Sequence, residues 1–193
     1  SVLSCYGQDS SIYLRFKKYN ELNGLPSTNV YKITEDGNGF IWLATQDGIY
    51  RFDSKEFHYI NIYNSSSKQI TWTAFSELFY DDSSGLLFTA SPYNGIAFLN
   101  TKSNYEGFSI IDINVNEFEG VNIHSITKLE SYYILSTNKG LWQLSINQQT
   151  FGISLARISV SFSNTDFILS DKINDSTLLS ITSKNEFIEN KIE

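Results

Sequence analysis

Two aspartates lie in similar short motifs and are the first candidates in this chain for acid–base chemistry. Asp36 opens Asp-Gly-Asn-Gly-Phe-Ile-Trp, and Asp82 opens Asp-Ser-Ser-Gly-Leu-Leu-Phe. Two carboxylates that flank a glycosidic bond can cleave it, one as a general acid and the other as a nucleophile or base. Each motif is also rich in turn residues, and an aspartate in a turn usually accepts hydrogen bonds from nearby backbone amides. We therefore interpret Asp36 and Asp82 as turn residues.

The remaining reactive residue types do not form a known catalytic pattern. His58 and His124 are the only histidines and lie far apart, with no carboxylate or second histidine at ligand spacing, so we predict no metal site. The stretch 65–68 reads Ser-Ser-Ser-Lys, but Ser-x-x-Lys chemistry needs a helix start and partner motifs, and this stretch is a polar loop. The chain has no nucleophile elbow, P-loop or dinucleotide fingerprint. We predict no enzyme activity, no catalytic residue and no cofactor.

Composition limits the partners that the chain could have. The 193 residues contain 15% aromatic and 18% charged residues, a balance that favours a packed core over disorder. The net charge is −7 and no basic run occurs, which argues against a nucleic acid partner. No apolar stretch approaches the roughly 20 residues that span a bilayer, so we expect no membrane span in this segment.

The first residues predict a processed or irregular end. The chain contains no methionine, so we expect that something was removed in front of Ser1. Residues 1–11 have the character of a leader remnant or a disordered end. Residues 2–5 loosely match a bacterial lipoprotein box, which leaves lipidation of Cys5 as an alternative.

Internal repeats are the strongest signal in the sequence. The motifs at Asp36 and Asp82 are 46 residues apart. A second anchor, a short turn that opens an alternating strand, recurs at Gly48, Gly95 and Gly140, with an asparagine at 185. These positions suit a hairpin residue with positive φ. A period of about 45 residues that contains four short strands is typical of a β-propeller blade.

We therefore predict an all-β chain of about four four-stranded antiparallel blades over residues 12–193. The expected blades cover 28–63, 74–111, 122–155 and 165–193, and the first strand of each lines a central channel. The last unit stops after three strands. Residues 12–19 read as a spare strand that could close the last blade from outside, because it would cover an open sheet edge.

The first unit resembles a known family. Residues 16–19 (Phe-Lys-Lys-Tyr), 23–27 (Asn-Gly-Leu-Pro-Ser) and 36–53, which include Gly-Phe-Ile-Trp-Leu-Ala-Thr, are similar to the two-component regulator propeller repeat. The resemblance implies the periplasmic sensor region of a hybrid two-component regulator of Bacteroidetes, held in the inner membrane. Such a sensor binds oligosaccharides cut from a polysaccharide and signals to a histidine kinase in the parent protein.

Four units are fewer than the family uses. Its members carry two seven-bladed propellers and an immunoglobulin-like domain, so we favour a segment of a seven-bladed propeller. A self-closed ring of four blades is the alternative, since the strand over 12–19 and the fifteen others would complete it. A homodimer that pairs two half-rings is also open.

Topology predicts where a ligand would bind. The turn between the second and third strands of each blade emerges on the same face as the links between blades, and such loops commonly carry binding residues. The expected ligand residues on these turns and links are Gln46, Asp47, Lys68, Trp72, Tyr93, Asn94, Asn138 and Lys139. Four aromatic residues at strand centres are instead expected in the core between blades, namely Trp42, Phe88, Trp142 and Phe187. A non-catalytic protein-interaction module is the alternative function.

Overall fold

The structure is a computed structural model of the chain. It describes residues 16–92, 94–103, 105–111, 120–147, 149–158, 165–174, 177–184 and 186–191. Within this part the chain is all-β, apart from one short 3-10 helix, Glu21–Asn23. The predicted fold class is confirmed.

Blade 1 is a four-stranded antiparallel sheet. Its strands are β1 (Val30–Glu35), β2 (Ile41–Thr45), β3 (Ile49–Phe52) and β4 (Phe57–Tyr63). They follow one another in the sheet as they do in the sequence. Their β-branched and aromatic residues suit a pleated sheet that is buried on one face. The tight turns match the sequence pattern, and Gly39 has a φ of 82° in the turn between β1 and β2.

Blade 2 comprises β6 (Glu77–Asp81), β7 (Leu86–Ser91), β8 (Gly95–Asn100) and β9 (Gly107–Ile110). Its outermost strand also pairs in parallel with β4 of blade 1, with Asn61 opposite Gly107 and Tyr63 opposite Ser109. A short strand, β5 (Gln69–Ile70), pairs antiparallel with the same end of β4, at Ile62 and Tyr63. Blades 1 and 2 therefore form one continuous nine-stranded sheet, which the sequence pattern did not predict.

Two further sheets complete the described chain. Blade 3 contains β10 (Ile123–Leu129), β11 (Tyr132–Thr137), β12 (Gly140–Ile146) and β13 (Ile153–Arg157). Blade 4 contains β14 (Phe167–Asn174), β15 (Thr177–Thr182) and β16 (Phe187–Lys191). The hairpin glycines Gly95 and Gly140 have φ values of 93° and 104°, as the repeat predicts.

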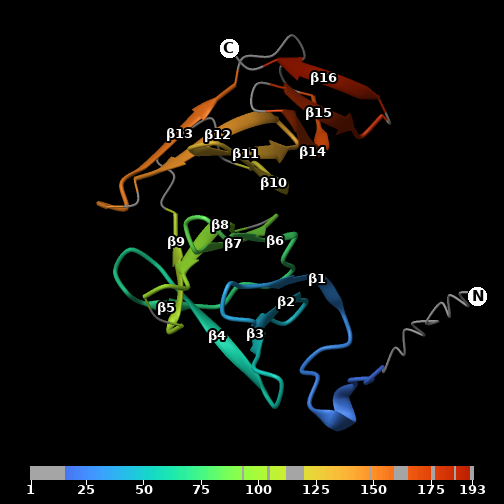
Figure 1. Ribbon diagram of the computed structural model, residues 1–193, viewed down its shortest axis with the longest axis vertical. Coiled ribbons are helices and arrows are strands. Elements are labelled where there is room, and N and C mark those ends of the chain that lie inside the picture. The colour runs from blue at the N-terminus through green and yellow to red at the C-terminus, as the bar shows by residue number, and fades with distance from the viewer. Residues whose placement is uncertain are drawn as a thin grey trace, which may run out of the picture.

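The blades stack in sequence order and their first strands lie side by side. β1 contacts β6, β6 contacts β10, and β10 contacts β14. Blade 1 and blade 4 lie at opposite ends of the stack, so the described residues form an open arc of a propeller rather than a closed ring of four blades (Figure 1). Of the two architectures left open by the sequence, the described residues adopt the open one.

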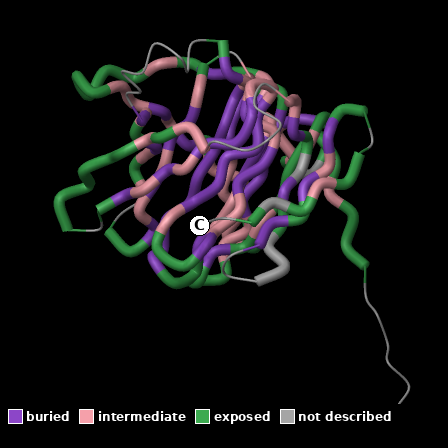
Figure 2. Tube along the Cα trace, turned by 90° about the horizontal axis from the view of Figure 1, so that it is seen from above, coloured by how far each residue is buried: buried purple, intermediate pink, exposed green. Residues whose placement is uncertain are grey.

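Three apolar cores hold the stack together, one at each junction between blades. Figure 2 shows that the buried residues gather along the central strands, whereas turns and outer hairpins are exposed. A buried leucine- or phenylalanine-sized side chain stabilises a fold by about 1.5–3 kcal/mol. The main members are Trp42, Ile49, Leu87 and Phe108 between blades 1 and 2; Phe88, Ile96, Leu135 and Trp142 between blades 2 and 3; and Leu129, Ile134, Phe167 and Leu178 between blades 3 and 4.

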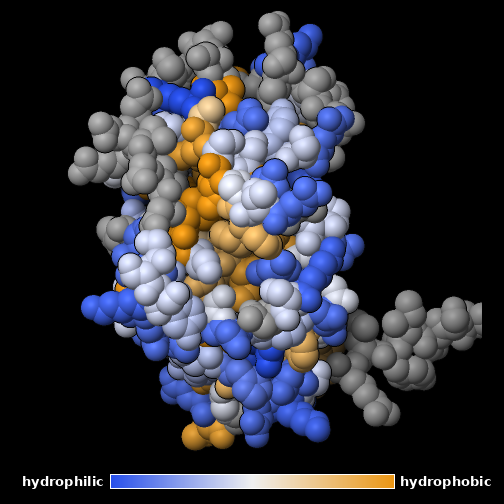
Figure 3. All heavy atoms as spheres, turned by 90° about the vertical axis from the view of Figure 1, so that its left-hand side faces the viewer, coloured by the Kyte–Doolittle hydropathy of each residue, from blue (hydrophilic) through white to orange (hydrophobic). Residues whose placement is uncertain are grey.

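The core between blades 2 and 3 continues to the outer edge of the stack. On the side that carries β5, β9 and β13, apolar surface gathers in a band rather than in scattered spots (Figure 3). Phe151, from the hairpin that joins β12 and β13, is 41% exposed and stacks on Phe98 of β8 with ring centroids 6.0 Å apart. This contact crosses the junction between the two blades.

The end faces of the stack carry exposed apolar side chains. On blade 1, Ile33 and Tyr59 lie on the face opposite Trp42 and are 64% and 43% exposed. On blade 4, Phe187 and Leu179 lie on the face opposite the buried Leu178 and are 70% and 40% exposed. The core-packing interpretation is therefore correct for Trp42, Phe88 and Trp142, whereas Phe187 is exposed in the described blades. No described blade covers its side of the sheet.

The predicted closing strand is not formed by its described part. Residues 16–19 adopt no strand, and Tyr19 packs edge-on against Phe52 and Phe57 of blade 1, at 5.0 and 5.8 Å between ring centroids. This segment therefore contacts blade 1, and the apolar rings of the hairpin between β3 and β4 hold it there. Residues 12–15, residues 1–11 and Cys5 lie outside the described residues.

Candidate functional site

The predicted ligand turns lie at one end of the sheets. Gln46 and Asp47, between β2 and β3, are exposed, and the Gln46 side chain accepts a hydrogen bond of 2.5 Å from Asn29. Asn94, between β7 and β8, is exposed and donates to Ser91 at 3.0 Å. These hydrogen bonds hold the side-chain amides of Gln46 and Asn94 against their own blades.

In the turn between β11 and β12 and in the link after blade 1, polar side chains also form hydrogen bonds with backbone amides. Asn138 accepts a hydrogen bond from the backbone amide of Asn122 at 2.8 Å, and Lys139 beside it is half-buried. Lys68 is exposed, and its backbone amide donates to the Asn64 side chain. The same Asn64 oxygen accepts the amide of Ser66, so the Ser-x-x-Lys stretch is a polar turn rather than the start of a helix.

One predicted ligand residue has no accessible face. Trp72 is 2% exposed and packs against Phe75, with ring centroids 6.3 Å apart, in the core between blades 1 and 2. The expected stacking role of Trp72 is therefore wrong, because the link folds its large apolar ring inward. Tyr93 lies outside the described residues.

A cavity follows the first strands of blades 2, 3 and 4, where the channel of a propeller is expected. Its volume is about 400 Å³. Glu77 and Phe79 of β6, Thr127 and Lys128 of β10, and Asp171 of β14 line it, together with Ser125, Ile126 and Ser170. The sequence predicted that these strands line the channel but did not single out these residues.

Glu77 is the least accessible carboxylate of this cavity. Its residue is 6% exposed, and its Oε1 lies 3.3 Å from the ammonium of Lys32 and accepts the amide of Leu78 at 2.8 Å. Burial disfavours the charged form of a carboxylic acid. Burial raises the pKa of Glu77 despite these partners. The channel therefore contains a carboxyl group, that of Glu77, whose pKa is raised by burial.

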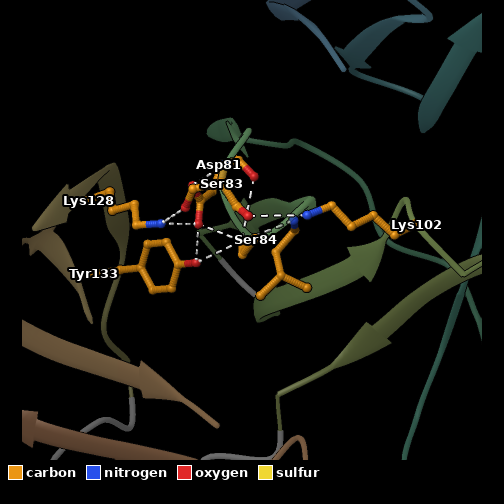
Figure 4. A network of polar contacts seen from close by, with 7 residues as sticks. Asp81, Ser83, Ser84, Lys102, Lys128 and Tyr133 are labelled. Carbon is orange, nitrogen blue, oxygen red and sulfur yellow. Dashed lines mark hydrogen bonds and ion pairs between the residues drawn. The ribbon is translucent and has the colours of Figure 1, made fainter. Parts of the chain in front are cut away.

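A second carboxylate joins blades 2 and 3 beside the cavity. Asp81 lies at the end of β6 and is 4% exposed. Its Oδ2 accepts hydrogen bonds from Lys128 at 2.5 Å, Ser84 at 2.5 Å and Tyr133 at 2.7 Å, and its Oδ1 accepts from Ser83 at 2.9 Å. Figure 4 shows Lys128 and Tyr133 approaching this group from blade 3.

The electrostatics of this network make Asp81 a stable anion. Burial alone raises its pKa, but hydrogen bonds from Lys128, Ser84 and Tyr133 outweigh burial, and the pKa of Asp81 lies well below its ordinary value. Burial, together with the hydrogen bond to Asp81, raises the pKa of the Tyr133 hydroxyl far above its ordinary value. The network therefore stabilises Asp81 as an anion at the junction between blades 2 and 3.

The structural counterpart of Asp36 in blade 2 is Asp81, one residue before the Asp82 that the sequence motifs align with it. Asp36 accepts the amides of Asn38 and Phe40 and the Trp42 indole N–H at 2.9 Å. In blade 2 it is Asp81, not the exposed Asp82, that accepts the amide two residues later. The interpretation of Asp36 as a turn residue is confirmed.

Each histidine has a carboxylate neighbour that the sequence spacing did not reveal. The Nε2 of His58 lies 2.8 Å from Asp53 Oδ2, across the hairpin between β3 and β4. The Nε2 of His124 lies 3.1 Å from Asp166 Oδ1. Within the described ranges, no three His, Cys, Asp or Glu side chains converge as metal ligands.

The comparisons with known proteins agree with this geometry. Residues 24–47 match the model of the family described as two component regulator propeller. The matched segment covers the lead-in to blade 1, β1, β2 and the turn that holds Gln46. The resemblance that the sequence indicated is confirmed.

Solved structures show the same propeller fold. The extracellular domains of two B. thetaiotaomicron proteins described as hybrid two component systems are each 20% identical to this chain. The first superposes with a TM-score of 0.72 over 91% of this chain and 25% of its own length, and the second with 0.63 over 89% and 21%. The β-propeller domain of Swd1 from Myceliophteria thermophila is 14% identical, with a TM-score of 0.58 over 83% of this chain and 52% of that one.

These similarities have clear bounds. The chain spans about a quarter of the length of the two B. thetaiotaomicron domains that it matches. No curated protein matches it significantly. Among the described residues, no helix is long and apolar enough to cross a membrane.

Proposed function

We propose that this chain is a ligand-sensing propeller segment from the extracytoplasmic region of a hybrid two-component regulator. The observation that carries the proposal is the regulator propeller repeat over residues 24–47, which begins the stack of blades. The two B. thetaiotaomicron domains of the same fold support an extracytoplasmic place, and we propose the periplasm of a Bacteroidetes bacterium. The histidine kinase activity would belong to the parent protein.

The exposed end faces support a larger ring. Ile33 on blade 1 and Phe187 on blade 4 are 64% and 70% exposed on sheet faces that elsewhere in the stack are covered by a neighbouring blade. Covering such faces with more blades removes apolar area from water, at about 25 cal/mol per Å². We propose that further blades of the parent protein cover both faces and that the ring has seven blades.

The signal that we propose is an oligosaccharide cut from a polysaccharide. The proposed contacts are on the turns at the loop end of the sheets, at Gln46, Asp47, Asn94, Asn138 and Lys139, with Lys68 on the link. Amide and charged side chains of this kind can hydrogen-bond sugar hydroxyls, and loops can vary while the sheets below them stay fixed.

Two experiments test this function. The coding region beyond Glu193 should encode further repeats of about 45 residues, then a membrane span and a histidine kinase. A thermal-shift screen of the whole sensor region against defined oligosaccharides should show saturable stabilisation by one class. A stop codon shortly after Glu193, or no response to a broad panel, would contradict the proposal.

A protein-interaction module is the competing function. The exposed Ile33, Leu179 and Phe187 favour it if no further blade covers them, because a large exposed apolar face usually marks a contact surface. It predicts that the whole sensor region binds a protein and no sugar.

A further inference from the structure

The junction between blades 1 and 2 contains a second cavity, at the end of the sheets opposite the predicted ligand turns. It is open to solvent and its volume is about 630 Å³. The turn between β1 and β2 and the loop between β8 and β9 form its walls, through Asn38, Phe40, Thr101, Lys102, Ser103 and Tyr105. Two blades therefore contribute to one cavity.

Two aromatic rings give this cavity an apolar wall. Phe40 and Tyr105 are half-buried and pack edge to face, with centroids 5.2 Å apart and planes at 83°. The Asn38 side chain donates to the Tyr105 hydroxyl at 2.5 Å, and Trp42 lies behind Tyr105 at 5.9 Å. The rings are thus fixed before any ligand arrives, which lowers the entropy cost of binding.

Arg51 places a positive charge against both rings of this wall, and no ion pair of Arg51 is found among the described residues. Its guanidinium carbon lies 4.6 Å from the centroids of both Phe40 and Tyr105. Its Nε–H is buried and has no acceptor among the described residues. The carboxylate of Asp36 is already occupied by two backbone amides and the indole of Trp42. A buried donor without an acceptor is destabilising.

Lys102 supplies a second cation at the rim. Lys102 is exposed, and its ammonium donates to the backbone carbonyl of Ser83 at 3.1 Å (Figure 4). No ion pair of Lys102 is found in the described part of the chain, whereas Lys32 and Lys128 pair with Glu77 and Asp81. Two cations for which no ion pair is found among the described residues, Arg51 and Lys102, therefore lie beside one cavity.

We propose that this cavity binds an acidic sugar residue, one that carries a carboxylate or a sulfate. The C–H face of the sugar would pack on Phe40 and Tyr105, and its acid group would lie against Lys102 and the positive field of Arg51. Charged hydrogen bonds of this kind are about twice as strong as neutral ones. The choice of a sugar rests on the proposed function, and the acid group is argued from the two cations.

Isothermal titration of the chain with trigalacturonic acid tests the site, with α-1,4-galactotriose as the uncharged counterpart and a sulfated heparin disaccharide as the second acid. We expect saturable binding of at least one acid, weaker binding at high salt, and at least tenfold weaker binding of the neutral sugar. Lys102→Met and Arg51→Met should each weaken binding of the acid at least tenfold. The two acids separate a carboxylate from a sulfate as the preferred group.

Lys184→Met is the control, since Lys184 is an exposed lysine on the opposite end of another blade. It should leave the affinity unchanged. Lys102→Met changes a surface residue, so the test does not depend on the folding of Arg51→Met. Absence of binding by both acids, or acid binding that neither Lys102→Met nor Arg51→Met weakens, would overturn the site. If only the neutral sugar binds, this site is wrong while oligosaccharide sensing stands; if no sugar binds either the chain or the whole sensor region, both fail.

Discussion

The ammonium of Lys128 lies 2.5 Å from the carboxylate of Asp81, and this ion pair joins two blades that share no strand pairing. Blades 1 and 2 are joined differently, by the parallel pairing of β4 with β9. Both junctions also contain an apolar core and an ion pair, which is Lys32–Glu77 between blades 1 and 2, so strand pairing is what distinguishes the first junction in the described stack.

Lys128→Met should destabilise the fold. It leaves the Asp81 carboxylate, which is 4% exposed, without the one cation that pairs with it among the described residues, and breaking a buried pair in this way typically costs about 3–5 kcal/mol. Chemical unfolding at pH 7 measures the loss. Lys55→Met, at an exposed turn residue, should change the free energy of unfolding by less than about 0.5 kcal/mol. Equal losses in the two variants would contradict the role of the pair.

The cost of Asp81→Asn should depend on pH. The pKa of Asp81 is lower in the folded chain than its ordinary value of 3.8, so between the two values the unfolded chain binds more protons. The stabilisation by Asp81 is therefore complete above about pH 4 and is lost as the pH falls through the lowered pKa. The difference in unfolding free energy between the two proteins should be constant from pH 7 to about pH 5 and should begin to shrink below about pH 4. A difference that stays constant or grows toward pH 3 would count against this.

Glu77→Gln should have the opposite pH dependence. Burial raises the pKa of Glu77 above its ordinary value of 4.5, so the folded chain binds more protons in the window above 4.5 and stability falls as the pH rises through it. The amide removes this loss, and we expect Glu77→Gln to be at least as stable as the natural chain at pH 7. Its advantage should shrink below pH 4.5. A strongly destabilised variant at pH 7 would show that the Lys32 pair outweighs burial.

Gly107→Ala should disrupt the joint between blades 1 and 2. A Cβ at this position would lie 2.7 Å from the carbonyl oxygen of Asn61 and against the ring of Tyr63, so β9 could not stay beside β4. We expect a loss of about 1–3 kcal/mol in unfolding free energy, the usual cost of overpacking. Gly152→Ala is the matched control, because its nearest contact is the Thr150 hydroxyl at 3.2 Å. Similar losses for both would argue against a special role of the joint.

Phe187→Ser should reduce self-association without loss of stability. The side chain is 70% exposed on the open face of blade 4, so the folded chain gains little from it, while an exposed apolar face favours contact between copies. Sedimentation velocity at several protein concentrations measures the change. Ile96→Ser, in the core between blades 2 and 3, serves as the contrast and should unfold the chain. A destabilised Phe187→Ser variant would show that the face is covered.

Local sequence patterns were sufficient to predict the class of the fold and the local shape of each blade. The recurrence of Gly48, Gly95 and Gly140 marks hairpins whose backbone conformation only a small set of residues adopts. Strand alternation and turn residues act between neighbours in the chain, so they can be read without the tertiary structure. The motif at residues 36–42 was enough to place Asp36 as a turn residue, because its partners lie within six positions.

Tertiary structure alone decided which residues meet across the junctions. Asp81 rather than Asp82 became the buried carboxylate because Lys128 and Tyr133, 47 and 52 positions away, surround it. Trp72 was expected to face a ligand and turned inward, because the blades on either side offer it an apolar core. Tyr105 contacts Asn38, which lies 67 positions earlier in the chain, and completes a cavity that no local sequence pattern predicts. Contacts over such distances depend on how the blades stack, and the stacking is set by the fit of whole sheet faces rather than by any short run of residues.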